Sequence, residues 1–153
     1  MSDDHIEYVT ARVDGQLFGL PILRVRDVFV PERITRVPLA EREITGLLNL
    51  RGRIVTILGM RQVLGFDAPR LVDPDADAAS PMAIGVEHGG ESYGLLVDSI
   101  GEVLRLEAAG FERNPFNLDP RVARVSCGVH RLETEIMIVL DIDRVLDVKA
   151  QAA

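Results

Sequence analysis

Two aspartates near the C-terminal end are the first candidates for acid–base or metal chemistry. Asp141 and Asp143 flank a single isoleucine, and a carboxylate pair of this kind could bind a metal ion or move a proton. Residues 142–146 are predicted to form a short helix, and acidic side chains at a helix start complement its free N–H groups. We therefore favour a capping role. Residues 73–77 read DPDAD but lack the glycine and terminal glutamate of a calcium loop, which favours a solvated linker.

The histidines and the cysteine are the remaining candidates for metal binding or nucleophilic catalysis. His5, His88 and His130 lie in a predicted tail, a hairpin turn and a strand, and no two have the spacing of zinc ligands. Each is expected to be solvated. Cys127 lies three residues before His130, but residues at that spacing on a strand point to opposite faces, so no catalytic dyad is expected. We predict a small buried cysteine, no metal site and no cofactor.

An enzyme could still be built on Asp98, Asp141, Asp143 or Cys127. Such an enzyme would need a concave site on which these side chains converge.

One arginine suggests a different activity, the recognition of a partner protein. Arg51 precedes Gly52, which permits a tight turn, and a guanidinium held there could offer its donor fork to a carboxylate or backbone carbonyl. A solvated arginine without a partner is the plainer interpretation of this residue alone.

Composition restricts the class of partner. The chain has 24 acidic and 17 basic residues and a formal net charge of −7, whereas nucleic acid and anionic membranes attract Lys and Arg clusters. No apolar run reaches the roughly 18 residues of a membrane span. The N-terminal residues, MSDDH, are too acidic and polar for a secretory signal. We predict a cytoplasmic protein that binds no nucleic acid and does not insert directly into a membrane.

Short runs of Val, Ile and Leu between turn residues predict a mostly β protein. Asp14 and Gly15 form a turn dipeptide between two such runs. Residues 53–58 are a nearly continuous apolar run, which predicts a strand buried on both faces. Residues 22–29 are compatible with either a short helix or a bent strand. The expected strands are residues 8–13, 17–22, 34–37, 46–50, 53–58, 82–87, 92–98, 102–106, 122–130 and 135–140, and the expected short helices are residues 60–64 and 142–146.

The elements are expected to belong to one domain. Residues 67–80 are rich in Pro and Asp with small Ala between them, which predicts a mobile loop. The domain is expected to span residues 7–147, with flexible tails at residues 1–6 and 148–153.

One pattern occurs twice along the chain. Residues 15–20 read GQLFGL and residues 90–95 read GESYGL, an offset of 75 positions that also relates Asp27 to Glu102. Residues 53–64 align with residues 135–146 at an offset of 82 positions. This self-similarity predicts two copies of one supersecondary plan, and it favours a duplicated binding scaffold over a catalytic pocket built once.

At the level of motifs, the chain resembles the CheW-like chemotaxis coupling domains. Residues 46–55, GLLNLRGRIV, are similar to the NLRG-containing core motif of that family. Three further stretches match in the order of the family, namely residues 18–28 (FGLPILRVRDV), 94–104 (GLLVDSIGEVL) and 140–146 (LDIDRVL). The resemblance covers about residues 7–147. Four motifs in order are more specific than any one of them.

The resemblance implies an all-β fold of two SH3-like five-stranded β-barrel subdomains that share a hydrophobic core, with short helices. It implies a non-catalytic adaptor that couples chemoreceptors to a CheA-type histidine kinase in bacterial chemotaxis. The partners would be the regulatory domain of the kinase, the cytoplasmic tip of a methyl-accepting chemoreceptor and other CheW-like domains in rings. The adaptor would be cytoplasmic and recruited to receptor arrays at the membrane. A coupling protein for a chemosensory output other than motility is the alternative.

The resemblance also implies two sets of contact residues. The receptor-binding set would be Arg51, Asn49, Leu48 and Gly46, with Val97 and Ile100 completing the apolar wall of a groove between the subdomains. Plain core packing is the alternative for the aliphatic members. The kinase-binding set would be Ile22, Val25 and Asp27, with Asp27 setting register more than affinity.

One position departs from the family pattern. Gly59 stands before residues 60–64, where the family usually has aspartate. Loss of that cap is expected to loosen the following short helix by about 1 kcal/mol.

Overall fold

The strands pair into two sheets that form two lobes. The structure is a computed structural model that describes residues 4–66 and 81–151. In this part of the chain the six-stranded sheet has the order β8-β1-β2-β11-β10-β9, and the five-stranded sheet has the order β3-β6-β7-β5-β4. The six-stranded lobe contains β1 (His5–Val13), β2 (Gln16–Pro21), β8 (Ser99–Glu107), β9 (Phe111–Glu112), β10 (Ser126–Arg131) and β11 (Ile136–Leu140). The five-stranded lobe contains β3 (Asp27–Phe29), β4 (Ile44–Leu50), β5 (Arg53–Gly59), β6 (Met82–His88) and β7 (Glu91–Val97).

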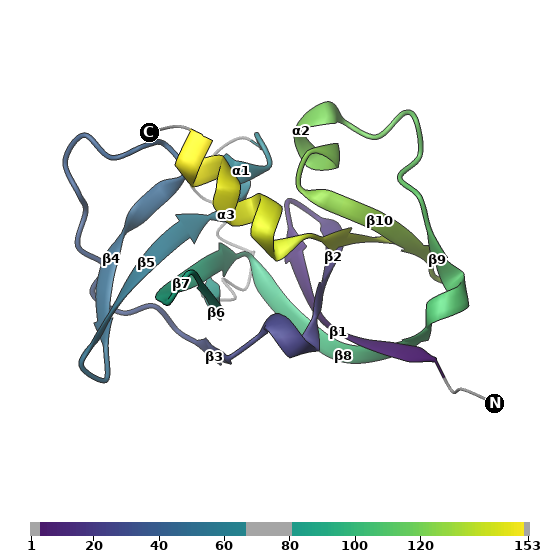
Figure 1. Cartoon of the computed structure of the whole chain (residues 1–153), viewed down its shortest axis with the longest axis horizontal. Coiled ribbons are helices and arrows are strands. Elements are labelled where there is room, and N and C mark those ends of the chain that lie inside the picture. The colour runs from purple at the N-terminus through teal and green to yellow at the C-terminus, as the bar shows by residue number, and fades with distance from the viewer. Residues whose placement is uncertain (1–3, 67–80, 152–153) are drawn as a thin grey trace, which may run out of the picture.

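Short helices connect the strands, and the last of them crosses the junction of the lobes. They are η1 (Ile22–Arg24), α1 (Met60–Val63), η2 (Ala108–Gly110), α2 (Pro120–Ala123) and α3 (Ile142–Gln151). Helix α3 leaves β11 of the six-stranded lobe and runs across the junction toward β5 and α1 (Figure 1). The Arg144 N–H donates to Oδ1 of Asp141 over 3.2 Å at its start. This bond confirms the capping role predicted for Asp141.

The two copies of the sequence repeat form the same arrangement of paired strands in the two lobes. Strands β2 and β11 are parallel, with Phe18 opposite Ile138. Strands β7 and β5 are also parallel, with Tyr93 opposite Thr56. Phe18 and Tyr93 are 75 positions apart, and Thr56 and Ile138 are 82 positions apart. The order β8-β1-β2-β11-β10 therefore recurs as β3-β6-β7-β5-β4.

Each lobe is assembled from both halves of the chain. The six-stranded lobe combines β1 and β2 with β8 to β11, and the five-stranded lobe combines β3 to β5 with β6 and β7. The central parallel pair of each sheet joins a strand of the first half to a strand of the second. Because both central pairs are formed this way, neither half can complete a sheet alone.

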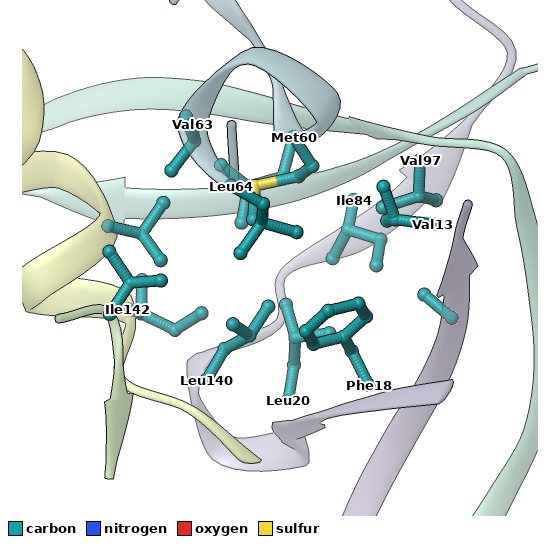
Figure 2. Packing of buried hydrophobic residues seen from close by; sticks show 14 of the residues in the cluster. Val13, Phe18, Leu20, Met60, Val63, Leu64, Ile84, Val97, Leu140 and Ile142 are labelled. Carbon is teal, nitrogen blue, oxygen red and sulfur yellow. The ribbon is translucent and has the colours of Figure 1, made fainter. Parts of the chain in front are cut away.

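One apolar core joins the lobes. It contains Phe18 and Leu20 of the six-stranded lobe, Ile84 of the five-stranded lobe, and Met60 and Leu64 of the α1 region. Figure 2 shows these side chains gathered between the α1 turn and the strands. Each lobe adds a smaller cluster, around Tyr8 and Met137 in one and around Leu48 and Ile57 in the other. The predicted fold of two small β subdomains over a shared core is confirmed.

Residues 22–29 contain both alternatives left open by their sequence. Residues 22–24 form the 3₁₀ turn η1 after Pro21, and residues 27–29 form the edge strand β3. The Arg26 N–H donates to the carbonyl of Gly85 over 2.8 Å, which starts the pairing of this segment with β6.

Two strand predictions were wrong in part. Residues 122–123 belong to helix α2, because Asp119 accepts a bond from the Arg121 N–H and Pro120 occupies the first helical turn. The expected strand at residues 34–37 is reduced to one bridge between Thr35 and Leu47. The corresponding place in the other lobe holds the two-residue strand β9, which pairs with Val129, 82 positions beyond Leu47.

Two element boundaries and the burial of β5 also differ from expectation. Strand β1 begins at His5 and α3 extends to Gln151, so ordered elements reach into both ranges expected to be tails. Ile54 is 62% exposed, so β5 is buried on both faces only toward its C-terminal end. The loop expected at residues 67–80 lies outside the described residues.

Candidate protein-binding surfaces

The turn between β4 and β5 presents an arginine in an unusual backbone conformation. Arg51 has φ of 53° and Gly52 has φ of 84°, and the Gly52 N–H donates to Oδ1 of Asn49 over 2.9 Å. A non-glycine residue with positive φ is uncommon and is typical of tight hairpin turns. The Arg51 side chain is exposed and makes no hydrogen bond or ion pair with any described residue. Its donor fork is therefore available to another molecule.

Arg51 lies on the rim of a recess in the five-stranded lobe. The recess has a volume of about 350 Å³, with Phe29, Leu50 and Val55 among its apolar lining and Arg26, Asp27, Arg51, Arg53 and Glu87 around them. We call it the arginine mouth. Glu87 accepts bonds from Arg26 over 2.8 Å and from Arg53 over 3.2 Å. These bonds hold two of the three arginines, whereas Arg51 is left unbound by the described residues.

The other predicted receptor residues on β4 differ in how far they are exposed to solvent. Asn49 is exposed and fixes the Arg51 turn. Leu48 is only 5% exposed and packs with Val55 and Ile57. Gly46 is buried where Thr35 pairs with β4, and a side chain there would collide with Thr35 and Ile34. The positions of Leu48 and Gly46 favour a structural role for both.

The remaining predicted receptor residues lie elsewhere. Val97 is 3% exposed and belongs to the shared core, beside Val13 and Ile84 in Figure 2. It also lines a separate cleft of about 200 Å³ at the end of β7, together with Arg61 and Asp98. Ile100 packs against the shared core. The structure therefore does not bring the six predicted receptor residues into one groove.

The predicted kinase residues are divided between the core and the arginine mouth. Ile22 and Val25 are half-buried and pack against the shared core. Asp27 is exposed and lines the arginine mouth, where its carboxylate lies over Gly85. Asp27 and Arg51, predicted to contact different partners, thus lie on the rim of one recess.

An ionic cluster around a largely buried arginine ties α1 to the six-stranded lobe. The Arg61 guanidinium donates to both carboxylate oxygens of Asp98, over 2.9 and 2.6 Å, and to Asp14 over 3.2 Å. The side chain of Arg61 is only 18% exposed. Its hydrogen bonds to Asp98 raise the pKa of Arg61 above its usual value. We call this group the first clamp. Sequence reasoning did not select Arg61 or Asp14.

A second clamp has its central residue at the corresponding repeat position, with the charge of that residue reversed. Arg61 and Asp143 are 82 positions apart, and Asp143 starts α3 as Arg61 starts α1. Asp143 accepts a bond from Arg24 over 2.9 Å and lies 3.2 Å from Nδ1 of His88. The bond from Arg24, helped by His88, lowers the pKa of Asp143. The repeat could have indicated both clamps, because their central residues are aligned in it.

The acidic residues considered for catalysis are therefore separated. Asp98 binds Arg61, Asp141 caps α3, and Asp143 binds Arg24. No group of three or more potential metal ligands occurs among residues 4–66 and 81–151. No helix in the described ranges is long and apolar enough to cross a membrane.

Two predictions about single residues were wrong. His130 is 3% exposed, and its Nε2 lies 3.1 Å from the hydroxyl of Tyr8. Burial lowers the pKa of His130 and raises that of Tyr8.

Cys127 is exposed, because a bulge between Ser126 and Gly128 turns it outward. Its pKa is raised, chiefly by partial burial, which does not favour a thiolate nucleophile.

The family of the chain follows from its match to a known domain. The family profile described as CheW-like domain matches residues 7–150. The chain belongs to the CheW-like domain family. The match includes both copies of the repeat and every strand from β2 to β11. The family expected from the four motifs is confirmed.

Individual CheW-like relatives match over most of their length. Chemotaxis protein CheW of Treponema pallidum is 24% identical over 149 residues, covering 97% of this chain and 86% of the relative. Chemotaxis protein CheW of Klebsiella aerogenes is 25% identical over 146 residues, covering 95% and 84%. The crystal structure of scaffolding protein TtCheW from Thermoanaerobacter tengcongensis superposes with a TM-score of 0.75 at 25% identity, covering 89% of this chain and 88% of that one.

Proposed function

We propose that this CheW-like chain is a non-catalytic adaptor that couples chemoreceptors to a CheA-type histidine kinase in chemotaxis signalling. Family membership supports the proposal, as do relatives named chemotaxis protein CheW and a similar structure described as a scaffolding protein. The adaptor acts in the cytoplasm and is recruited to receptor arrays at the membrane. Other CheW-like domains are further partners in such arrays.

The unbound guanidinium of Arg51 carries the proposal. It stands on a strained, asparagine-fixed turn beside an apolar recess, and no described residue accepts a bond from it. A positive φ at a non-glycine residue has a conformational cost, and such strain gathers at functional sites. An arginine beside apolar surface is typical of a protein–protein contact.

The two partners are assigned to different edges of the five-stranded sheet, the receptor to the β4 edge and the kinase to the β3 edge. The receptor contacts Arg51 and Asn49, and Leu48 and Gly46 support that surface from within the five-stranded lobe. Val97 and Ile100 pack in the shared core, away from this surface. The kinase contacts Asp27 on the β3 side, with Ile22 and Val25 holding the β3 segment against the core. Asp27 is exposed, so its charge orients the kinase more than it adds affinity.

A binding experiment with two single variants tests this assignment. The wild type, Arg51→Ala and Asp27→Ala would each be offered a CheA-type kinase regulatory domain and a receptor cytoplasmic fragment at moderate salt. We expect the wild type to retain both proteins, Arg51→Ala to lose the receptor alone, and Asp27→Ala to weaken the kinase alone. Arg42→Ala, an exposed arginine outside the arginine mouth, is the matched control.

Two results would count against the proposal. If the wild type retains neither partner, the chemotaxis assignment fails. If both variants lose the same partner, the arginine mouth is one surface for one protein and the division between partners is wrong. The second result is a real alternative, since Arg51 and Asp27 line one recess.

The adaptor is also proposed to lack phosphotransfer and hydrolytic activity. Asp143, one member of the carboxylate pair, is bound to Arg24 and His88 in the second clamp. Asp143→Asn should therefore leave partner binding unchanged. A turnover activity of the wild type that this substitution abolishes would refute the adaptor-only proposal.

A further inference from the structure

Two glycines stand side by side inside the five-stranded sheet. Gly85 of β6 pairs with Gly94 of β7, and Asp27 of β3 pairs with Gly85 from the other side. Directly paired residues of antiparallel strands direct their side chains to the same face of the sheet. The glycine pair therefore leaves a strip of this face without side chains of its own, and β3 lies along the end of that strip.

The side chains of β3 lie over this strip. Phe29 covers Gly94, where its Cζ is 3.1 Å from the place that a Cβ atom would take. The Asp27 carboxylate covers Gly85 so closely that a Cβ atom there would overlap its Oδ1, and its Cγ is 3.2 Å from the same place. The place over Gly85, which we call the carboxylate seat, exists because residue 85 has no side chain.

The seated carboxylate belongs to the arginine mouth and has no partner in the described part of the chain. Asp27 and Gly85 both line that recess. Glu87, two residues further along β6, accepts the bonds of Arg26 and Arg53. No described residue donates a hydrogen bond to the carboxylate of Asp27. Its charge is therefore available to another protein, at a place that Gly85 fixes.

The other lobe shows the same position with the seat filled. Thr10 and Gly19 are the repeat counterparts of the glycine pair, each 75 positions earlier, and they pair with each other between β1 and β2. The second glycine is kept, whereas Thr10 fills the place of the first and is 3% exposed. The Thr10 hydroxyl donates to the backbone carbonyl of Glu102, the counterpart of the seated aspartate. The six-stranded lobe thus has no vacant place for a carboxylate at this position.

We propose that Gly85 is a positioning residue for the kinase contact, because the seat over it fixes where Asp27 presents its carboxylate. The inference rests on the proposed function, in which the exposed charge of Asp27 orients the kinase. A charge selects a partner by its position, since a displaced charge no longer meets its counterpart across the interface. The specificity of the β3 edge then depends on a buried residue that offers no side chain to any partner.

Gly85→Ala fills the carboxylate seat with one methyl group. The three atoms nearest to that methyl group all belong to Asp27, and the carboxylate among them can swing aside. Alanine is more favourable than glycine inside a strand, so the variant should melt no lower than the wild type. Gly110→Ala is the matched control, because its methyl group makes only an ordinary contact with His130, at 3.5 Å.

The first measurement needs no partner protein. The side-chain carboxyl carbon of Asp27 is followed by NMR in the wild type, in Gly85→Ala and in Gly110→Ala. Its resonance should move in Gly85→Ala, because the carboxylate leaves the seat, and should stay in place in the control. An unchanged resonance in Gly85→Ala would overturn the inference, since the position of the carboxylate would then not depend on Gly85.

Binding of a CheA-type kinase regulatory domain is the functional measurement. Gly85→Ala should weaken this binding about twofold to fivefold, the usual contribution of one exposed charge pair, and leave binding of the receptor fragment unchanged. Asp27→Ala should weaken kinase binding by the same factor. The double variant should bind no more weakly than either single variant, a non-additivity expected only if Gly85 acts through Asp27.

Two binding results would overturn the inference. One is a Gly85→Ala variant that binds the kinase as tightly as the wild type. The other is a loss that Gly85→Ala causes in full when Asp27 is already alanine, because Gly85 would then act by another route. A wild type that binds no kinase is a distinct result. It refutes the proposed function and the kinase contact together, whereas the Asp27 resonance still decides whether Gly85 positions the carboxylate.

Discussion

At the scale of single residues, the candidate site separates into residues that face solvent and residues that hold them in place. Asn49 and Leu48 are neighbours on β4 with opposite orientations. Asn49 accepts the bond that fixes the Arg51 turn, and Leu48 fills the smaller core of the five-stranded lobe. Because successive side chains of a strand point to opposite faces of the sheet, the two residues have different functions.

Substitution of these two neighbours should separate stability from binding. Leu48→Ala should lower the free energy of unfolding by about 2 to 4 kcal/mol, because it leaves a cavity beside Val55 and Ile57. Asn49→Ala should cost about 1 kcal/mol, the loss of one turn hydrogen bond, yet weaken receptor binding more than Leu48→Ala does. Denaturant unfolding and binding to the receptor fragment measure the two effects. A loss of receptor affinity that parallels the loss of unfolding free energy in both variants would contradict the assignment.

His130 should make stability depend on pH. Burial depresses its folded-state pKa, so below about pH 6.5 the unfolded chain binds a proton that the folded chain resists. The stability that the neutral imidazole contributes is present above the unfolded pKa and is lost as pH falls through the folded one. Unfolding at pH 7, 6 and 5 should therefore show decreasing stability.

A double variant isolates this effect from the other titrating groups. Leu48 occupies the repeat position of His130, and Ala83 occupies that of Tyr8. Tyr8→Phe with His130→Leu removes both the titration and the hydrogen bond, so neither partner is left unsatisfied. The unfolding free energy of the wild type minus that of the double variant should therefore decrease as the pH falls, because only the wild type carries the His130 titration. A difference that stays constant would contradict a buried, neutral His130.

The sequence indicated some of these residues and not others. The NLRG motif pointed to Arg51, and its exposed turn was expected from Gly52. Burial of His130 and exposure of Cys127 were missed, because a bulge at Ser126 and Gly128 shifts the alternation of β10. A bulge adds one residue to a strand and leaves only a weak sequence signal.

At the scale of elements, the two clamps fasten corresponding helices to the opposite lobes. Arg61 of α1 binds the β1–β2 turn and the end of β7, and Asp143 of α3 binds η1 and the end of β6. The Arg61 side chain is 18% exposed in the first clamp, whereas the Asp143 side chain is 57% exposed in the second. Their energetic contributions should differ accordingly.

Removal of the two clamps should measure that difference. Arg61→Ala should lower the free energy of unfolding by about 2 kcal/mol or more, because Asp98 loses two charge-assisted hydrogen bonds. Arg24→Ala should cost about 0.5 kcal/mol, the usual contribution of an exposed ion pair. Chemical denaturation of both variants is the measurement. Equal losses would contradict the clamp assignment.

Gly59 offers a way to strengthen α1. It occupies the N-cap with φ of −79° and makes no side-chain bond to the helix. An aspartate at this position should stabilise the protein by a few tenths of a kcal/mol, because glycine already caps better than alanine and Gln62 must move aside. This gain is smaller than the 1 kcal/mol expected from the motif alone. A loss of stability in Gly59→Asp, measured by thermal unfolding, would show that Gln62 cannot move.

Element types were predictable where a local signal was strong. Turn glycines and aliphatic runs indicated most strands, and Asp141 indicated the start of α3. The division of residues 22–29 into η1 and β3 depends on the Arg26–Gly85 hydrogen bond, a partner 59 positions away that no local pattern reveals. Val122 was predicted as strand although a local signal, Asp119 followed by Pro120, starts a helix there.

At the scale of the whole molecule, the interleaved strands make the two lobes one folding unit. Both central parallel pairs join the first half of the chain to the second, and one core crosses between the lobes. The repeat predicted the duplication, but it did not predict the exchange of strands. Self-similarity in a sequence shows which segments are equivalent and does not show which strands pair with each other.

This exchange predicts how fragments behave. Residues 1–70 and residues 75–153 should each be unfolded alone, since each carries only part of both sheets. Mixed in equal amounts, they should regain the circular dichroism and cooperative melting of the intact chain. A fragment that folds alone would show that a lobe does not need strands from both halves.

The central claim is that one chain holds a receptor and a kinase at the same time. The most direct measurement is the mass, by light scattering after size-exclusion chromatography, of the chain mixed with a receptor cytoplasmic fragment and a CheA-type kinase regulatory domain. The adaptor account predicts a complex that contains all three proteins and loses only the receptor when Arg51 is replaced by alanine. Binary complexes that displace one another, with no ternary species at any ratio, would contradict it.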